Sequence, residues 1–103
     1  MLENITKSMF ADNLNSAFRL ESAANQTLEL QLIECREGAT TPGYEHFFLM
    51  FKGPKTIVLS QRTYELEHPV LGKFPLFLVP VKQDTDGTYY ESVFNRLIPQ
   101  KAE

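Results

Sequence analysis

The fold class follows from a short stretch of alternating residues, LELQLI at positions 28–33. Leucines at every second position are separated by Glu29 and Gln31, which is the pattern of a β-strand with one buried face and one wet face. The same period of two occurs in residues 17–21, where Phe18 and Leu20 alternate with charged residues. Two half-buried strands are therefore predicted in this part of the chain.

Further strands are predicted toward the C-terminus. Residues 46–51, HFFLMF, are apolar at both parities, which is typical of a central strand covered on both faces. The alternating residues 62–67 and the apolar run that follows predict a hairpin with a longer loop over residues 62–80. Asp86-Gly87 precedes a last strand and predicts a tight turn with Gly87 at positive φ, so that Gly87→Val destabilises the fold by roughly 1–2 kcal/mol.

The N-terminal segment shows helical spacing instead. Thr6 is a suitable N-cap, and Ile5 and Phe10 then occupy the two positions of a hydrophobic staple. These features predict a short helix over roughly residues 6–14. Three apolar residues share one face of this helix: Met9, Phe10 and Leu14.

Together these elements predict a mainly β fold, with a short N-terminal helix and about six antiparallel strands. Such a sheet must close or fold over to bury its apolar face, as a small barrel or a two-sheet sandwich. The 103 residues are enough for one core, so residues 1–103 are expected to form a single domain.

The composition excludes several classes of function. The formal net charge is −3 and the basic residues are scattered, so no nucleic acid partner is expected. The longest apolar run, residues 74–81, contains Pro75 and Pro80 and is far shorter than the ~18 residues of a membrane span, so no membrane partner is expected. The absence of a secretory signal pattern and the single cysteine favour a reducing cytoplasm, with later incorporation into an extracellular or virion-like assembly still compatible.

The residues that could carry chemistry do not form a recognisable constellation. Cys35 as a nucleophile needs a base, for which His46 and His68 are the candidates, but its acidic neighbours oppose a lowered thiol pKa. Glu65 and Glu67 share one face of a strand whereas His68 points to the other, so they do not form a metal site. We therefore expect no enzymatic activity, no metal and no cofactor, with Cys35 packed as a small hydrophobe and His68 capping a turn.

Tyr89 and Tyr90 are the candidate interface residues. Adjacent residues of a strand face opposite sides, so one of the two tyrosines points outward. The strand at residues 17–21 and the last strand, Thr88–Asn95, are the candidates for an unprotected sheet edge, because prolines already guard the strand before the last. We expect a partner protein or a second copy to bind a surface that includes Thr88–Asn95. In the alternative, this strand pairs with Phe74–Val81 and closes the barrel.

A series of short motifs in the C-terminal half resembles a known family. They read FKGP (51–54), LSQRTY (59–64), LEHP (66–69), LG (71–72), FLVPV (77–81) and YESVFN (90–95). Their order is similar to that in short bacterial proteins catalogued only as a domain of unknown function, whose members tend to read FxGP, LPQxTYxLEHPxLG, LFLVPV and YEAVFN. The N-terminal half matches in outline, with FRL at 18–20. The resemblance implies an accessory or structural role near phage-tail-like collar proteins, and it carries over no catalytic residue.

Three functions follow, in decreasing order of support. The first is a non-enzymatic protein-interaction or structural module, linked through the resemblance to a phage-tail-like assembly. The second is a small β-barrel that binds an apolar or aromatic ligand between Phe47–Phe51 and Phe74–Val81, although small barrels are usually filled by their own side chains. The third is an enzyme that uses Cys35 and a histidine.

Overall fold

The computed structural model describes residues 5–21, 26–38 and 42–97. Within these ranges one short helix precedes six strands, which confirms the mainly β fold predicted from the alternation. The elements are α1 (Lys7–Asp12), β1 (Ala17–Glu21), β2 (Thr27–Glu37), β3 (Tyr44–Gly53), β4 (Arg62–His68), β5 (Gly72–Gln83) and β6 (Thr88–Leu97).

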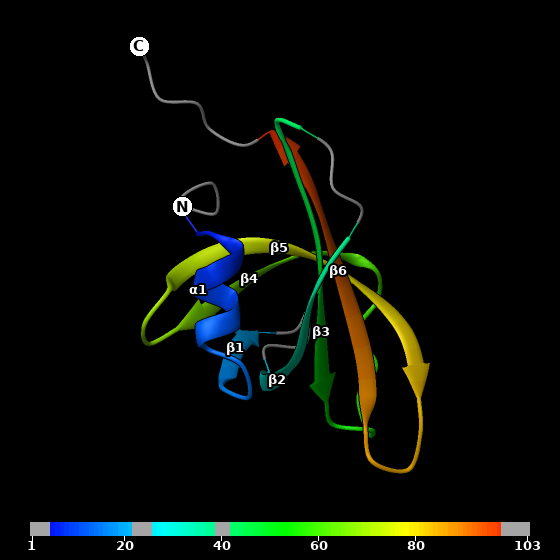
Figure 1. The fold of residues 1–103 in the computed structure, drawn as a ribbon. Coiled ribbons are helices and arrows are strands. Elements are labelled where there is room, and N and C mark those ends of the chain that lie inside the picture. The colour runs from blue at the N-terminus through cyan, green and yellow to red at the C-terminus, as the bar shows by residue number, and fades with distance from the viewer. Residues whose placement is uncertain (1–4, 22–25, 39–41, 98–103) are drawn as a thin grey trace.

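The six strands form a closed barrel in the order β1-β2-β3-β6-β5-β4, so the sheet closes on itself rather than forming a sandwich (Figure 1). All the strand pairings are antiparallel. The hairpin predicted over residues 62–80 is present as β4 and β5, which pair from Arg62↔Leu78 to His68↔Gly72. β3 lies between β2 and β6, which confirms the central position predicted for residues 46–51.

The alternation seen in the sequence separates the core from the outer surface. In β1, Phe18 and Leu20 are buried while the residues between them are exposed. The same pattern runs along β4 and the first half of β5. The buried apolar side chains fill the barrel interior: Ile5, Phe10, Phe18, Leu20, Leu28, Leu30, Leu32, Phe47, Leu49, Phe51, Leu59, Tyr64, Leu66, Phe74, Leu76, Leu78, Tyr90 and Phe94.

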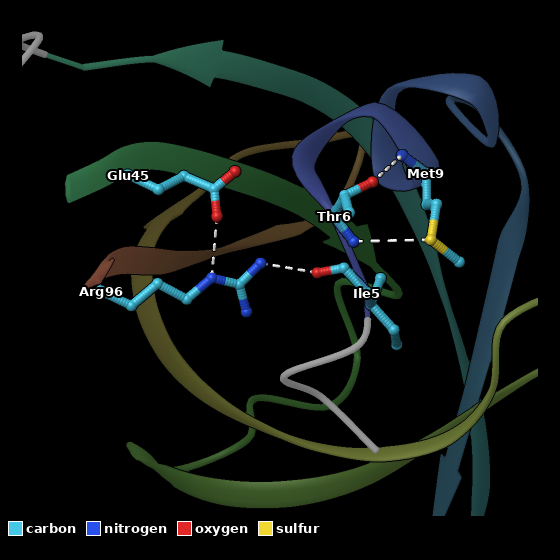
Figure 2. Close-up of polar contacts among 5 residues, drawn as sticks. All are labelled: Ile5, Thr6, Met9, Glu45 and Arg96. Atoms are coloured by element: carbon cyan, nitrogen blue, oxygen red, sulfur yellow. Dashed lines mark hydrogen bonds and ion pairs between the residues drawn. The ribbon is translucent and has the colours of Figure 1, made fainter. Parts of the chain in front are cut away.

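Helix α1 begins as predicted, but fewer of its apolar side chains are buried than predicted. The Thr6 hydroxyl accepts the N–H of Met9 at 3.1 Å, and the Thr6 N–H donates to Met9 Sδ at 3.5 Å, so both ends of a capping box are made (Figure 2). Phe10 is fully buried, but Met9 and Leu14 are 36% and 41% exposed. The prediction of a shared apolar face is therefore wrong. The helix ends at Asp12, before Leu14, and Met9 is used in the cap.

The single buried side chain of α1 fills one end of the barrel. The Phe10 ring centre lies 6.1 Å from that of Phe47, 5.9 Å from Phe74 and 5.6 Å from Phe94, which belong to β3, β5 and β6. Ile5, just before the helix, is buried in the same core. Helix α1 is thus a plug for three strands that are far apart in the sequence.

The turn between β5 and β6 differs from the prediction. The hairpin is present, but its loop has four residues, Asp84 to Gly87, and the Asp84 N–H donates to the Gly87 carbonyl at 2.9 Å. The Asp84 carboxylate also accepts the N–H groups of Asp86 at 2.8 Å and Gly87 at 3.1 Å. The predicted positive φ of Gly87 is wrong, since only Gly43 and Gly72 among the described glycines have it. The longer loop closes through the Asp84 side chain and does not need left-handed backbone.

Two neighbouring pairs of strands in the barrel are hydrogen-bonded over only part of their length. β1 and β4 share one ladder pair, Arg19↔Glu67. β5 and β6 pair from Gln83↔Thr88 to Val79↔Glu91, with a bulge between Pro80 and Lys82. Beyond Glu91, β6 continues beside β3 alone as far as Leu97, and Figure 1 shows these two strands running on past the place where β5 crosses.

Candidate interaction surface

The two adjacent tyrosines of β6 have different roles. Tyr90 points into the barrel and is 1% exposed. Its hydroxyl accepts the N–H of Leu59 at 2.9 Å and donates to the Ile57 carbonyl at 3.4 Å, so it anchors the connection between β3 and β4. Burial raises the pKa of this hydroxyl. The prediction that Tyr90 is an interface residue is wrong, because its side chain belongs to the core.

Tyr89 is the outward member of the pair, as strand alternation requires, and it is half-buried by its own hairpin. The Lys82 ammonium lies 5.0 Å from its ring centre, and its hydroxyl donates to Asp84 Oδ1 at 3.4 Å. The backbone N–H of Asp86 is the main reason that the pKa of Asp84 is lowered, and partial burial raises the pKa of Tyr89. Tyr89 therefore braces the hairpin at the flank of the outer surface.

The outward side of β5 and β6 next to Tyr89 carries several exposed apolar residues, and the charged Glu91 of β6 lies among them. Val93 is 57% exposed, and Phe77 and Val81 are 48% and 47% exposed. Val79 lies between Phe77 and Val81 on β5 and pairs with Glu91 of β6, two residues before Val93. We call Phe77, Val79, Val81 and Val93 the β5–β6 outer face. Exposed apolar side chains gathered on one side of a small domain are typical of a protein contact surface.

The β5–β6 outer face adjoins a strand edge. From Ser92 to Leu97, β3 is the only strand in the described chain that pairs with β6. The β5–β6 ladder has a bulge between Pro80 and Lys82, and Pro75 lies in the part of β5 that pairs with β4 alone. This confirms the expectation that the two prolines mark an edge or bulge, where a missing N–H donor costs no ladder bond.

The prediction that β6 has an unprotected edge is correct only for the part of the strand after Glu91. Thr88–Glu91 has β5 on one side and β3 on the other, which is the closing arrangement that was the alternative. The rest of β6 is the part without β5. β1, the other candidate edge, pairs with β2 over its whole length and meets β4 at Arg19.

Arg96 holds the inner side of this end of β6 in place. Its Nε donates to Glu45 Oε1 at 2.9 Å, and its Nη2 donates to the Ile5 carbonyl at 2.6 Å (Figure 2). The guanidinium also lies 5.0 Å from the ring centre of Phe94 and 5.5 Å from that of Phe47. These contacts join the segment before α1 to the ends of β3 and β6. Because Glu45 balances its charge, Arg96 does not repel a partner strand from this edge.

His68 and Ser16 are as close to each other as the members of a catalytic dyad, but their hydrogen bonds differ from those of a dyad. His68 Nε2 lies 2.9 Å from Ser16 Oγ. Its Nδ1 accepts the N–H groups of Val70 at 3.0 Å and Leu71 at 3.2 Å, so the ring proton is on Nε2 and donates to Ser16. The Ser16 hydroxyl in turn donates to the Asn13 carbonyl. A histidine with this tautomer caps the β4–β5 turn, as predicted, and cannot take the serine proton.

Cys35 and His46 do not come together with His68. Cys35 pairs with Leu49 and its thiol points toward the Lys7 carbonyl at 3.9 Å, while burial raises its pKa. His46 stacks on Tyr44 with ring centres 6.5 Å apart. Burial lowers the pKa of His68, which is 3% exposed. Glu65 and Glu67 are exposed on the face opposite His68, and no group of three potential metal ligands occurs among the described residues.

The chain belongs to a known family. A family model described as a domain of unknown function, DUF6916, matches residues 5–94. No curated protein and no solved structure matches the chain. In the described part of the chain, none of the helices has the length and apolar character needed to cross a membrane.

The apolar outer face could have been found from the sequence only in part. Val93 has the same parity as Tyr89, so it faces outward if Tyr89 does, but the sequence left open which of the two tyrosines points outward. Phe77 and Val81 were missed because they sit in a run that is apolar at both parities. Such a run predicts cover on both sides, whereas Phe77 and Val81 are exposed on the outer side of the barrel.

Proposed function

We propose that this protein is a non-enzymatic interaction module that binds a partner protein through the β5–β6 outer face. The observation that carries the proposal is the coincidence of Val93, exposed by more than half, with the stretch of β6 that β5 does not cover. Phe77 and Val81 extend the apolar area on β5. Apolar contact area next to an open strand edge suits protein association better than small-molecule binding.

Two features favour this role over the alternatives. The barrel interior is filled by phenylalanine and leucine side chains, which favours an interaction module over a barrel that holds a ligand between β3 and β5. The proton arrangement of His68 and Ser16 favours a structural role for both residues over an enzymatic one.

The finer proposal is an accessory role in a phage-tail-like assembly. It is supported by the family resemblance of the C-terminal motifs and by a compact barrel that presents one apolar side to a neighbour. If it is correct, the protein cosediments with tail-like particles from its host, and Val93→Glu abolishes the cosedimentation.

The general proposal is tested by affinity capture from host extract with a matched pair of variants. Val93 and Val58 are 57% and 55% exposed, but Val58 lies outside the β5–β6 outer face. We expect Val93→Glu to lose a specifically captured protein that wild type and Val58→Glu retain, with all three chains folded by circular dichroism. Equal capture by the two variants would place the interface elsewhere.

A further inference from the structure

We infer that Glu91 of β6 selects the partner: the protein that binds the β5–β6 outer face presents a lysine or arginine to this carboxylate, with apolar side chains around it. The inference rests on the proposed function and names the chemistry by which the same surface recognises its partner. Glu91 is then the residue that discriminates between one apolar partner surface and another.

Glu91 is surrounded on the outer side of the barrel by apolar and aromatic side chains. It pairs with Val79 of β5 on one side and with Met50 of β3 on the other. Along β6 its own face is shared by Tyr89 and Val93, because residues two positions apart in a strand point the same way. The partly buried carboxylate therefore lies in the middle of the surface that the partner would cover.

Within the described residues, the Glu91 carboxylate has no hydrogen-bond or ion-pair partner. The two nearby lysines are placed at the hairpin end of β6 instead. The Lys82 ammonium lies 3.7 Å from Asp84 Oδ2. The Lys52 side chain lies against Gly87, where an added Cβ would be 3.2 Å from its Cε. Glu91 is thus a charge that no described cation pairs with.

Covering this carboxylate makes its charge decisive for binding. In water the charge is hydrated, but apolar atoms placed over it remove that hydration and give nothing back. An ammonium or guanidinium group on the partner restores the lost interaction, and arginine is enriched in protein interfaces. The formal net charge of −3 also attracts a basic surface at long range. Charge complementarity therefore favours a partner with a cation among apolar side chains.

A second copy of this chain is a poor occupant of the same surface. In a two-fold dimer one patch faces an identical patch. The β5–β6 outer face consists of Phe77, Val79, Val81 and Val93 and supplies no cation, so two Glu91 carboxylates would be covered without a partner for either. A different protein is the occupant that the charge favours.

The test uses the full chain and a phage-displayed library of short, disulfide-constrained peptides as the probe. Binders to wild type are kept only if they are lost with Val93→Glu and retained by Val58→Glu. We expect these peptides to share a lysine or arginine between apolar residues. They should bind Glu91→Gln about tenfold or more weakly than wild type, because their cation is then covered without a counter-charge.

Two further variants complete the design. Glu29→Gln removes an exposed carboxylate from β2, outside this surface, and should bind the peptides as wild type does. A separate selection on Glu91→Lys should yield peptides with aspartate or glutamate in place of the cation. Circular dichroism checks that each variant is folded.

Several outcomes would overturn the inference. Peptides that depend on Val93 but share no cation would do so, as would equal binding by Glu91→Gln. Tighter binding by Glu91→Gln would mean that the carboxylate guards the surface against association. A library that yields no Val93-dependent peptide also counts against the inference. If capture of a host protein still depends on Val93 in any of these cases, the proposed function stands and only the role of Glu91 is wrong.

Discussion

Strand pairing in the barrel is incomplete at two places, between β1 and β4 and between β5 and β6. The outer surfaces of these two places differ. At the β1–β4 seam the single pair Arg19↔Glu67 lies in a charged surface that also includes Glu21, Glu65 and Lys73, around a hollow of about 480 Å³. At the β5–β6 opening three apolar side chains are exposed, Phe77, Val81 and Val93, and Glu91 is the charged residue among them. Charges keep a partly open seam soluble and unpaired, so the comparison separates a charged seam from the opening where we propose that a partner binds.

The insides of the two gaps differ as well. Beneath the β1–β4 seam, Phe18 and Leu66 of the strands themselves fill the core. Beneath the β5–β6 opening, Phe10 of α1 packs against Phe47 of β3, Phe74 of β5 and Phe94 of β6. The opening thus depends on an element outside the sheet for its stability.

The largest effect is expected when this plug is removed. Phe10→Ala deletes a fully buried ring that touches three other rings, and should lower the free energy of unfolding by about 3–5 kcal/mol. Leu14→Ala, at a 41% exposed position just after the helix, should cost less than about 0.5 kcal/mol. Urea unfolding measures both. Similar losses would mean that α1 does not close the barrel.

A smaller effect is expected where β5 and β6 are still joined. A Cβ at Gly87 would lie 2.5 Å from the Gly53 carbonyl oxygen, and this backbone atom cannot move aside as the nearby Lys52 side chain can. Gly87→Val should therefore destabilise the protein by about 1–3 kcal/mol through overpacking. Thr85→Val, in the exposed part of the same loop, is the control for thermal denaturation. An unchanged melting temperature for Gly87→Val would contradict the close approach of the hairpin to β3.

A pH effect is expected beside the β1–β4 seam, where His68 is buried and neutral. Burial lowers its pKa below the ordinary 6.5, so between the two values the unfolded chain binds a proton that the folded chain does not. Acidification through this range favours unfolding, and the stability returns as the pH rises above 6.5. The contribution of one proton is at most about 1.4 kcal/mol per pH unit. His68→Gln should show a shallower loss of stability than wild type between neutral and mildly acidic pH.

The sequence predicts what depends on neighbours along the chain and misses what depends on distant ones. Alternation placed Tyr90 and Tyr89 on opposite faces, and the capping residues placed the start of α1 at Thr6. Val81 is exposed at the bulge between Pro80 and Lys82, and the part of β6 without β5 begins where the pairing ends at Val79↔Glu91. Both depend on the pairing of distant segments. Gly87 shows the same limit, because loop length and the Asp84 carboxylate determine its backbone.

The smallest effect on folding provides the clearest test of the comparison between the two gaps. Glu67→Gln at the β1–β4 seam and Val93→Lys at the β5–β6 opening both change exposed positions, so each should alter the free energy of unfolding by less than about 0.5 kcal/mol. Their effects on binding should nevertheless differ, since only Val93 lies on the β5–β6 outer face. Partner capture should survive Glu67→Gln and be lost with Val93→Lys. If Glu67→Gln removes the partner instead, the charged seam is the contact surface, and the apolar opening is a gap that α1 merely fills.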